Sequence, residues 1–355
     1  MQKSIFYVLL AIGLGSCLKD ENFNLDYQGY VPQSINDDWQ VSTPAAEGMD
    51  HTFLNAAYEL LYQEDRYVMA RSLLAFRNGK LVAEAYPNDP NDINEYANIQ
   101  SCTKSFTSII TGVAIHNNQL SSLDERLYDI YPEYFDSDID KRTITIEEAL
   151  TMQTGLEFDN EVHTLEMYQT EGSSIEYILS QKRLYPSGLV MNYNDGAPHL
   201  LSKVIEKKTG MQMGQYAAEK LFVPLNITDW YWESSNDKTT FGAFSLYLKP
   251  RDLGKIGQLL LQYGTWDNQQ LIDSTYLAEA TQTKVAANFN SEPYGYYFWT
   301  LPAIEGYYAR GHGGQFLLIV PDKNLVVVYT AWPYTSDEFF DERNELMSLI
   351  INGCN

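Results

Sequence analysis

The sequence predicts an α+β fold, in which an antiparallel sheet is flanked by helices from both termini and a mostly helical subdomain is inserted. Three observations predict it. Strand patterns gather at both ends of the folded part, helical patterns lie outside them, and helical periodicity dominates the residues between. We expect a sheet part at 46–96 and 291–355 and a helical part at 97–290. A chain of 355 residues can form one such large domain.

The first part of the sheet is expected to follow a helix. Apolar residues recur at helical spacing just after Asp50, a residue type common at N-caps: Phe53, Leu54, Ala57, Leu60 and Leu61. Two strand patterns, 72–76 and 81–86, then flank Asn78-Gly79, the strongest short hairpin signal. The segment therefore predicts a helix followed by a β-hairpin.

The last part of the sheet is predicted from four short strand patterns: 294–300, 307–310, 316–320 and 325–330. Residues 321–324 (Pro-Asp-Lys-Asn) are expected to form the turn between the last two. A capping-box pattern follows, ahead of a terminal helix: Thr335 and Glu338, then Leu346, Leu349 and Ile350. Between the two parts, helices are expected at 200–208, stopped by Gly210, and at 253–261.

Residues 1–16 are predicted to be a lipoprotein signal peptide. Lys3 precedes an apolar run over 5–14, which is too short to span a bilayer of about 30 Å. Leu14-Gly15-Ser16-Cys17 resembles the bacterial lipobox, in which the cysteine thiol carries the lipid. The alternative is a buried N-terminal strand. Residues 17–45 are polar and are expected to be a tether.

The predicted location is the cell envelope, with the membrane contacted only through the lipid at Cys17. Residues 19–21 (Lys-Asp-Glu) after Cys17 resemble a signal that sends some Gram-negative lipoproteins to the outer surface. We therefore expect an exported protein in the outer membrane or at the cell surface of a Gram-negative bacterium. The sequence says nothing about oligomeric state.

The charge and cysteine content exclude several classes of function. Without residues 1–16 the chain keeps 23 basic and 47 acidic residues, a net charge of −24. Such a surface repels phosphate backbones, so no nucleic-acid partner is predicted. Three cysteines do not form a disulfide framework, and neither Cys-x-x-Cys nor His-x-x-x-His occurs. No metal site and no cofactor are predicted.

The first pattern with chemical meaning is Ser-x-x-Lys. It occurs three times, as Ser16–Lys19, Ser101–Lys104 and Ser235–Lys238, and only the second opens an apolar-periodic helix. On a helix, residues i and i+3 share a face, so the amine can reach the hydroxyl and activate it. The Ser101 amide would also lie at the positive end of the helix, where it stabilises an oxyanion. The alternative for Ser101 is a simple N-cap serine.

Two further patterns carry possible chemistry. A tyrosine near a lysine can have its pKa lowered and can move protons, which makes Tyr193 of Tyr193-Asn194-Asp195 a candidate. With 27 tyrosines in the chain, the alternative is ordinary packing. The stretch 311–315 (Gly-His-Gly-Gly-Gln) precedes a strand, and its glycines let a substrate approach backbone amides. Its alternative is a tight turn.

The order and spacing of these three motifs resemble the pattern of the serine β-lactamase and penicillin-recognising enzyme superfamily. The motifs are Ser101-x-x-Lys104, Tyr193-x-Asp195 and His312-x-Gly314. More narrowly, the chain resembles the class C-like branch of esterases, D-peptidases and aminohexanoate-oligomer hydrolases. The resemblance runs from about residue 48 to 335 and predicts a hydrolase domain over 46–335. Further matching stretches support it: 99–106, 150–156, 248–253 and 263–266.

The resemblance implies a serine hydrolase that forms an acyl-enzyme on a small ester or amide. Ser101 would attack the carbonyl, while Lys104 and Tyr193 move the proton to the leaving group. The amides of Ser101 and Gln315 would form the oxyanion hole. His312, Gly314 and Asp195 would contact the substrate, which is expected to be a small molecule or a short peptide.

Two departures from the family pattern narrow the substrate class. The family's Tyr-x-Asn is here Tyr193-x-Asp195, and its Lys-Thr-Gly is here His312-Gly313-Gly314. Histidine is mostly neutral at pH 7 and does not supply the fixed charge that holds a β-lactam carboxylate. Arg310 could supply this positive charge in place of the lysine if its side chain points into the site. Strand alternation leaves the direction of that side chain open. Ester or amide hydrolysis therefore ranks above β-lactam turnover.

The Asp195 departure also suggests how the proton moves. A carboxylate at this position should pair with Lys104 and keep it protonated, so that Tyr193 takes the serine proton.

The competing hypothesis for the whole protein is a non-catalytic surface module for binding or sensing on the same fold. An α/β-hydrolase is excluded, because no Gly-x-Ser-x-Gly occurs, and a metal-dependent lactamase lacks its His-x-His cluster.

The lipobox generates a direct prediction. Replacing Cys17 with alanine should release the protein from membranes and leave the folded domain intact, because the only membrane contact is then lost. Membrane fractionation after a salt wash measures this. A variant that still sediments with membranes would show that Cys17 is not the anchor.

Overall fold

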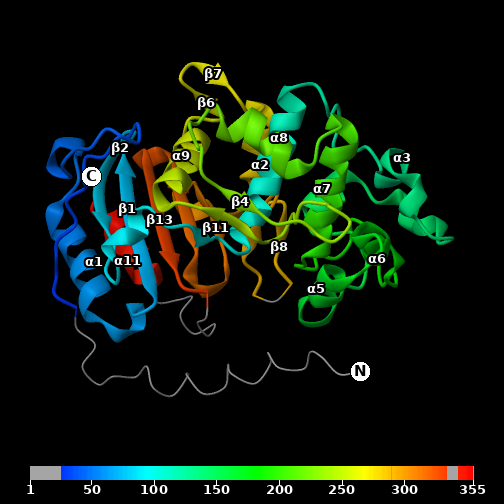
Figure 1. The fold of residues 1–355 in the computed structure, drawn as a ribbon, viewed down its shortest axis with the longest axis horizontal. Helices are drawn as coiled ribbons and strands as arrows, with labels where there is room; N and C mark the ends of the chain where they lie inside the picture. The colour runs from blue at the N-terminus through cyan, green and yellow to red at the C-terminus, as the bar shows by residue number, and fades with distance from the viewer. Residues whose placement is uncertain (1–24, 289, 334–342, 355) are drawn as a thin grey trace, which may run out of the picture.

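The computed structural model describes residues 25–288, 290–333 and 343–354 (Figure 1). The predicted signal peptide, Cys17 and the Thr335–Glu338 capping pattern lie outside the described residues. The α+β prediction is confirmed, since an antiparallel sheet of eight strands packs against helices (Figure 1). Within the described part of the chain, no helix is both long and apolar enough to cross a bilayer.

The main sheet joins the two ends of the chain. Its strand order is β2-β1-β13-β12-β11-β10-β9-β8, so β1 from the N-terminal hairpin pairs with β13 from the C-terminal meander. The strands are β1 Ala70–Arg77, β2 Lys80–Ala85, β8 Val285–Ala286, β9 Pro293–Tyr294, β10 Trp299–Leu301, β11 Gly306–Arg310, β12 Phe316–Val320 and β13 Leu325–Ala331. This long-range pairing joins the strands from the two ends of the chain into a single sheet.

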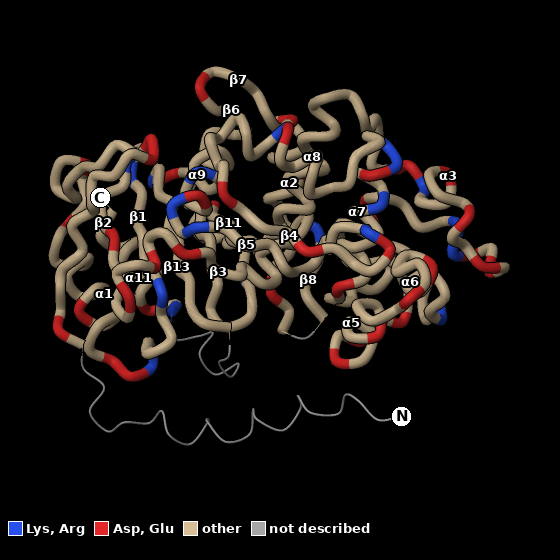
Figure 2. The backbone as a smooth tube through the Cα atoms, in the orientation of Figure 1, with Lys and Arg blue, Asp and Glu red and all other residues tan. Residues whose placement is uncertain are grey.

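Helices cover both sides of this sheet. In Figure 1, α1 and α11 lie together on the side away from the helical half, and α9 and α2 lie on the other. The helices are α1 His51–Gln63, α2 Cys102–His116, α3 Leu127–Ile130, α4 Ile146–Leu150, α5 Asn160–Gln169, α6 Ser174–Ser180, α7 Gly196–Thr209, α8 Met213–Ala217, α9 Pro250–Leu261, α10 Ser274–Ala280 and α11 Arg343–Asn352. Acidic residues are spread over the helices and loops of both halves (Figure 2).

Several local predictions are confirmed. The Asp50 carboxylate accepts a hydrogen bond from the Thr52 amide (2.8 Å) and caps α1. Asn78 and Gly79 both have positive φ (53° and 77°), as a tight β-hairpin turn requires. Gly210 ends α7 in the left-handed conformation (φ 73°). Local chemistry therefore determined these element boundaries.

The strand predicted over 294–300 is wrong. Its residues are divided between β9 and β10, and a bend separates them in which the Gly295 amide donates to the Phe298 carbonyl (2.8 Å). A Cβ on Gly295 would lie only 2.3 Å from the carbonyl oxygen of Ala280, so this glycine permits close packing against the end of α10. The apolar run reflects burial here rather than extended pairing.

The predicted helical part, 97–290, is mostly helical, as expected, and it also holds short strands. It contains two small sheets, one formed by β3 Ala97–Asn98, β5 Leu246–Leu248 and β4 Tyr231–Trp232, and one by β6 Thr265–Trp266 and β7 Gln269–Gln270. Its helix α9 packs directly on the main sheet and does not lie beside it. A Cβ on Gly254 would come within 2.3 Å of Phe76, so the missing side chain lets α9 approach the strands.

The described part of the predicted tether, residues 25–45, lies against the domain. Trp39 donates through Nε1 to the carbonyl of Arg251 (3.1 Å). The buried guanidinium of Arg251 in turn binds Glu84 of β2 (2.6 Å) and Asp37 (2.8 Å). Polar residues in this segment therefore pair with a buried charge from another part of the chain, which composition alone does not reveal.

The contact between α9 and the sheet generates a prediction. Gly254→Ala should lower the free energy of unfolding by about 1–3 kcal/mol, because a methyl group must be forced against Phe76. Urea unfolding measures the loss. Gly172→Ala is the matched control, since its Cβ would meet only Thr170 Oγ1 at 4.0 Å. Equal stability of the two variants would contradict the close packing of α9.

Candidate active site

Ser101 lies at the start of α2, on the wall of an open cleft of about 1040 Å³. The backbone turns into the helix through Gln100, which has positive φ (51°). The Ser101 side chain makes no capping hydrogen bond to the helix, so the simple N-cap interpretation is wrong. The hydroxyl is instead directed to Lys104.

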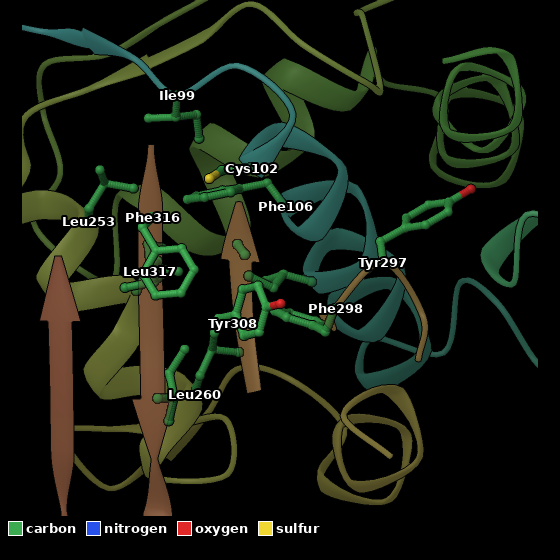
Figure 3. Close-up of a cluster of buried hydrophobic side chains, with 14 of the residues drawn as sticks. Ile99, Cys102, Phe106, Leu253, Leu260, Tyr297, Phe298, Tyr308, Phe316 and Leu317 are labelled. Carbon is green, nitrogen blue, oxygen red and sulfur yellow. The ribbon is translucent and has the colours of Figure 1, made fainter. Parts of the chain in front are cut away.

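Buried side chains fix the start of α2 against the sheet. Figure 3 shows Ile99, Cys102 and Phe106 packed towards Phe316 and Leu317 of β12, in a cluster that also includes Leu253 and Leu260 of α9. The Ile99 amide donates to the Leu246 carbonyl (3.0 Å), which ties the segment to β5. These contacts therefore hold the backbone at Ser101 in a fixed position.

Gly311 allows the end of β11 to approach Ser101. A Cβ on Gly311 would lie 2.4 Å from the Ile99 carbonyl oxygen and 3.0 Å from the Ser101 amide nitrogen. Any other residue would push the strand away from α2. Gly311, which was predicted to let a substrate approach the backbone, thus also lets the start of α2 approach the end of β11.

Lys104 is buried, with 1% of its side chain exposed. Its ammonium donates to Ser101 Oγ (2.9 Å), Asp195 Oδ1 (2.6 Å) and the Ala243 carbonyl (3.2 Å). Burial pushes the pKa of Lys104 down, but Asp195 and Tyr193 push it up and outweigh burial, so the pKa lies above its ordinary value. Lys104 is therefore an ammonium ion at neutral pH.

Asp195 is held at both its carboxylate and its backbone. Thr164 Oγ1 donates to Asp195 Oδ2 (2.8 Å), and the Asp195 amide donates to Asn160 Oδ1 (2.9 Å). The neighbouring Asn194 turns away and accepts from the Ala197 amide at the start of α7 (2.8 Å). Sequence reasoning missed Asn160 and Thr164; their only signal is an i, i+4 spacing on α5.

Tyr193 completes the group around Lys104. Its ring centroid lies 4.9 Å from Lys104 Nζ, and a side-chain hydrogen bond between the two contributes to the raised pKa of Lys104. The ring lies 5.8 Å from Trp299 and 6.1 Å from Tyr294, centroid to centroid. Aromatic neighbours thus hold Tyr193 at the cleft, where both Tyr193 and Trp299 form part of the lining.

The stretch 311–315 forms a turn next to Ser101, with Gly311 against the Ser101 backbone. Gly313 and Gly314 have φ of 76° and 95°, values that glycine adopts without strain. Gln315 is buried, and its side-chain amide donates to the Ala331 carbonyl (2.6 Å) and so fixes the turn to β13. His312 lines the cleft. The structure therefore places His312 in the cleft wall and Gln315 behind it.

Arg310 points into the cleft, which settles the direction that strand alternation left open. Its guanidinium lies 3.9 Å from the Trp299 ring centroid and forms an ion pair with Glu292 (2.8 Å). Glu161 and Asn160 line the cleft from α5. Among the described residues, no group of three potential ligands is arranged to hold a metal ion.

Comparisons with solved structures show the fold. A Bacillus anthracis protein assigned as a 6-aminohexanoate-dimer hydrolase matches at 21% identity, over 93% of this chain and 90% of its own, with a TM-score of 0.73. A family VIII carboxylesterase matches at 17% identity, over 88% and 98%, with a TM-score of 0.72. A Bacteroides dorei protein assigned as a β-lactamase matches at 15% identity, over 86% and 99%, with a TM-score of 0.71.

The comparison with curated proteins gave no significant match. The family model described as Beta-lactamase matches residues 62–350, which is most of the chain. The match covers Ser101, Lys104, Tyr193 and Asp195, the four residues that the structure brings together. The chain belongs to the β-lactamase family, within the serine β-lactamase and penicillin-recognising enzyme superfamily.

Proposed function

We propose that the protein is a serine hydrolase that cleaves a small ester or amide through an acyl-enzyme on Ser101. The observation that carries the proposal is the 2.9 Å hydrogen bond from Lys104 Nζ to Ser101 Oγ, at a serine that does not cap its helix. A retired site has no physical reason to keep a buried lysine aimed at a serine hydroxyl in an open cleft. The family's esterase and hydrolase relatives support the same class of reaction.

The proton route follows from the hydrogen bonds of Lys104. An ammonium ion has three N–H donors and no acceptor, so a protonated Lys104 cannot take the serine proton. The Tyr193 oxygen is the group left to receive it. Tyr193 gives its own phenol proton to the leaving group as the serine proton arrives, and the adjacent Lys104 charge stabilises partial negative charge on the Tyr193 oxygen during this relay.

The reaction then has two steps. Ser101 Oγ forms a bond to the substrate carbonyl carbon, the proton of Ser101 passes through Tyr193 to the leaving oxygen or nitrogen, and the bond to the leaving group breaks. In the second step a water molecule gives a proton to Tyr193, and the water oxygen bonds to the acyl carbon. The bond between that carbon and Ser101 Oγ then breaks, and Ser101 receives a proton from Tyr193 and regains its hydroxyl.

The oxyanion of each step needs donors from the cleft wall. We assign the backbone amides of Ser101 and Gln315, one at the start of α2 and one at the start of β12. The bonds that Gln315 makes to β13, and the close approach of Gly311 to Ser101, hold the two segments together. His312 and Gly314 lie next to this position and would contact the substrate.

The cleft favours esters and amides over β-lactams. No lysine occupies the position of His312, and Arg310, the cation that lines the cleft, is paired with Glu292. An incoming carboxylate would have to displace that partner.

The protein is proposed to act in the cell envelope, anchored by lipid at Cys17. The second candidate function, a non-catalytic binding or sensing module, is the outcome if Ser101 forms no covalent adduct.

The nucleophile assignment is tested by covalent labelling. Ser101→Ala should abolish reaction with a fluorophosphonate and lower the rate of short-chain ester cleavage by on the order of 10⁶, because the attacking oxygen is lost. Gel fluorescence and ester kinetics measure the two effects. Ser245→Ala, at another serine lining the cleft, should still be labelled. A labelled Ser101→Ala would place the nucleophile elsewhere, and an unlabelled wild-type protein would favour the binding module.

The proton route is tested by a pair of variants. Tyr193→Phe should lose about 10²–10⁴-fold in kcat/KM, the usual contribution of a general base. Asp195→Asn should keep substantial activity, but its pH profile should change. Burial lowers the Lys104 pKa and the carboxylate opposes this, so without the charge the Lys104 pKa falls. The high-pH limb of activity should then move to lower pH.

Steady-state kinetics across pH distinguish the alternatives. Near-normal activity of Tyr193→Phe, together with an inactive Asp195→Asn, would make the carboxylate the essential base. An alkaline limb at the same pH in Asp195→Asn and wild type would show that the Lys104 charge does not control it.

A further inference from the structure

A second cavity, of about 570 Å³, lies over α9 and shares no lining residue with the Ser101 cleft. We call it the α9 groove and define it by Trp39, Gln40, Asn78, Gln258, Gln262 and Trp266. Its rims are two tight hairpin turns, β1–β2 at Asn78 and β6–β7 at Asp267, and in Figure 1 the β6–β7 hairpin stands beside α9. The proposed reaction does not use this groove.

The floor of the groove contains an unsatisfied acceptor. Gln258 is only 6% exposed, and its Oε1 is buried without a hydrogen-bond partner in the described part of the chain. Buried carbonyl oxygens are normally paired, so this atom is a position for a donor from a bound molecule. Gly79 of the β1–β2 turn lies next to this amide, since a Cβ on Gly79 would be 3.8 Å from Gln258 Nε2.

The rest of the lining is rich in side-chain amides. Besides Gln258 it includes Gln40, Asn78, Gln262 and Asn268. An amide side chain both donates and accepts hydrogen bonds, and so does a hydroxyl group. A wall of amides is therefore complementary to a ligand that carries many hydroxyls.

Two indole rings provide apolar surface next to these amides. Trp39 is fixed by its Nε1 hydrogen bond to the Arg251 carbonyl (3.1 Å) and by contact with Phe76, at 4.3 Å between centroids. Trp266 is fixed in the β6–β7 hairpin, where it pairs with Gln269. Both rings are half-buried. A rigid aromatic face beside polar groups suits a sugar ring, which has an apolar C–H face and a polar edge.

The charges of the groove exclude an anionic ligand. Lys80 is paired with Glu47 (2.7 Å), and Lys255 lies 3.5 Å from Asp252 and 3.8 Å from Asp38. Each of the two lysines in the lining is thus neutralised by a carboxylate. A phosphate would find no uncompensated positive charge there, and an apolar chain would leave the amides without partners.

We propose that the α9 groove binds a short, neutral oligosaccharide at a site separate from the Ser101 cleft. The volume is within the range of small-molecule sites, and the lining matches hydroxyls by its amides and ring faces by its tryptophans. A protein that binds glycan in this way is held against a carbohydrate surface while its other cleft remains open.

The proposal is tested by isothermal titration calorimetry of the full chain in a sugar-free detergent. The probes are maltotriose, cellotriose and triacetylchitotriose, with inorganic phosphate as the anionic comparison. At least one trisaccharide should bind, and its affinity should fall tenfold or more in Trp266→Ala and in Gln258→Leu. Tyr231→Ala, at an exposed aromatic residue outside the groove, is the matched control and should bind as wild type.

Two further measurements separate this site from the reaction. Ser101→Ala should bind the trisaccharide with unchanged affinity, and the groove variants should cleave esters at the wild-type rate, which also shows that they are folded. Should Trp266→Ala fail to fold, Gln258→Leu alone decides. The proposal is overturned if none of the three sugars binds, if the folded groove variants keep full affinity, or if phosphate binds where sugars do not.

Discussion

The buried ion pair between Lys104 and Asp195 is the interaction on which the rest of the site depends. It joins α2 to the start of α7, and the Thr164 hydroxyl extends it to α5. Both charges are largely withdrawn from water, so removing either partner leaves the other desolvated and unpaired. The ammonium also donates hydrogen bonds to the Ala243 carbonyl and to Ser101 Oγ. The pair therefore positions the serine and sets the charge state of the lysine at once.

The proposed chemistry follows from this arrangement. A lysine that is already protonated serves as a fixed positive charge and not as a base. That charge lies 4.9 Å from the Tyr193 ring centroid, and both Tyr193 and Ser101 line the cleft. Where the family pattern has a neutral amide, this chain has the carboxylate of Asp195, which favours the protonated form of Lys104. In the proposed mechanism this departure makes Tyr193 the proton carrier and leaves Ser101 as the nucleophile.

The sequence predicted what local chemistry determines. The spacing of Ser101 and Lys104 on a helix, the Asn78-Gly79 turn and the Asp50 cap depend on neighbouring residues, and each is present as predicted. The contacts of Asn160 and Thr164 with Asp195 were missed, because they join segments more than 30 residues apart. The same limit explains residues 25–45, whose polar groups pair with the distant Arg251.

Direct observation of the Lys104 side chain tests the central claim, that Lys104 is a charged donor in the resting protein. Nitrogen-15 NMR of lysine-labelled protein at neutral pH, with Lys104→Met to assign the signal, counts the protons on Nζ. We expect three attached protons and slow exchange with water, because the ammonium is buried and hydrogen-bonded. A neutral Nζ with two protons would contradict it, and Lys104 would then be the base that activates Ser101.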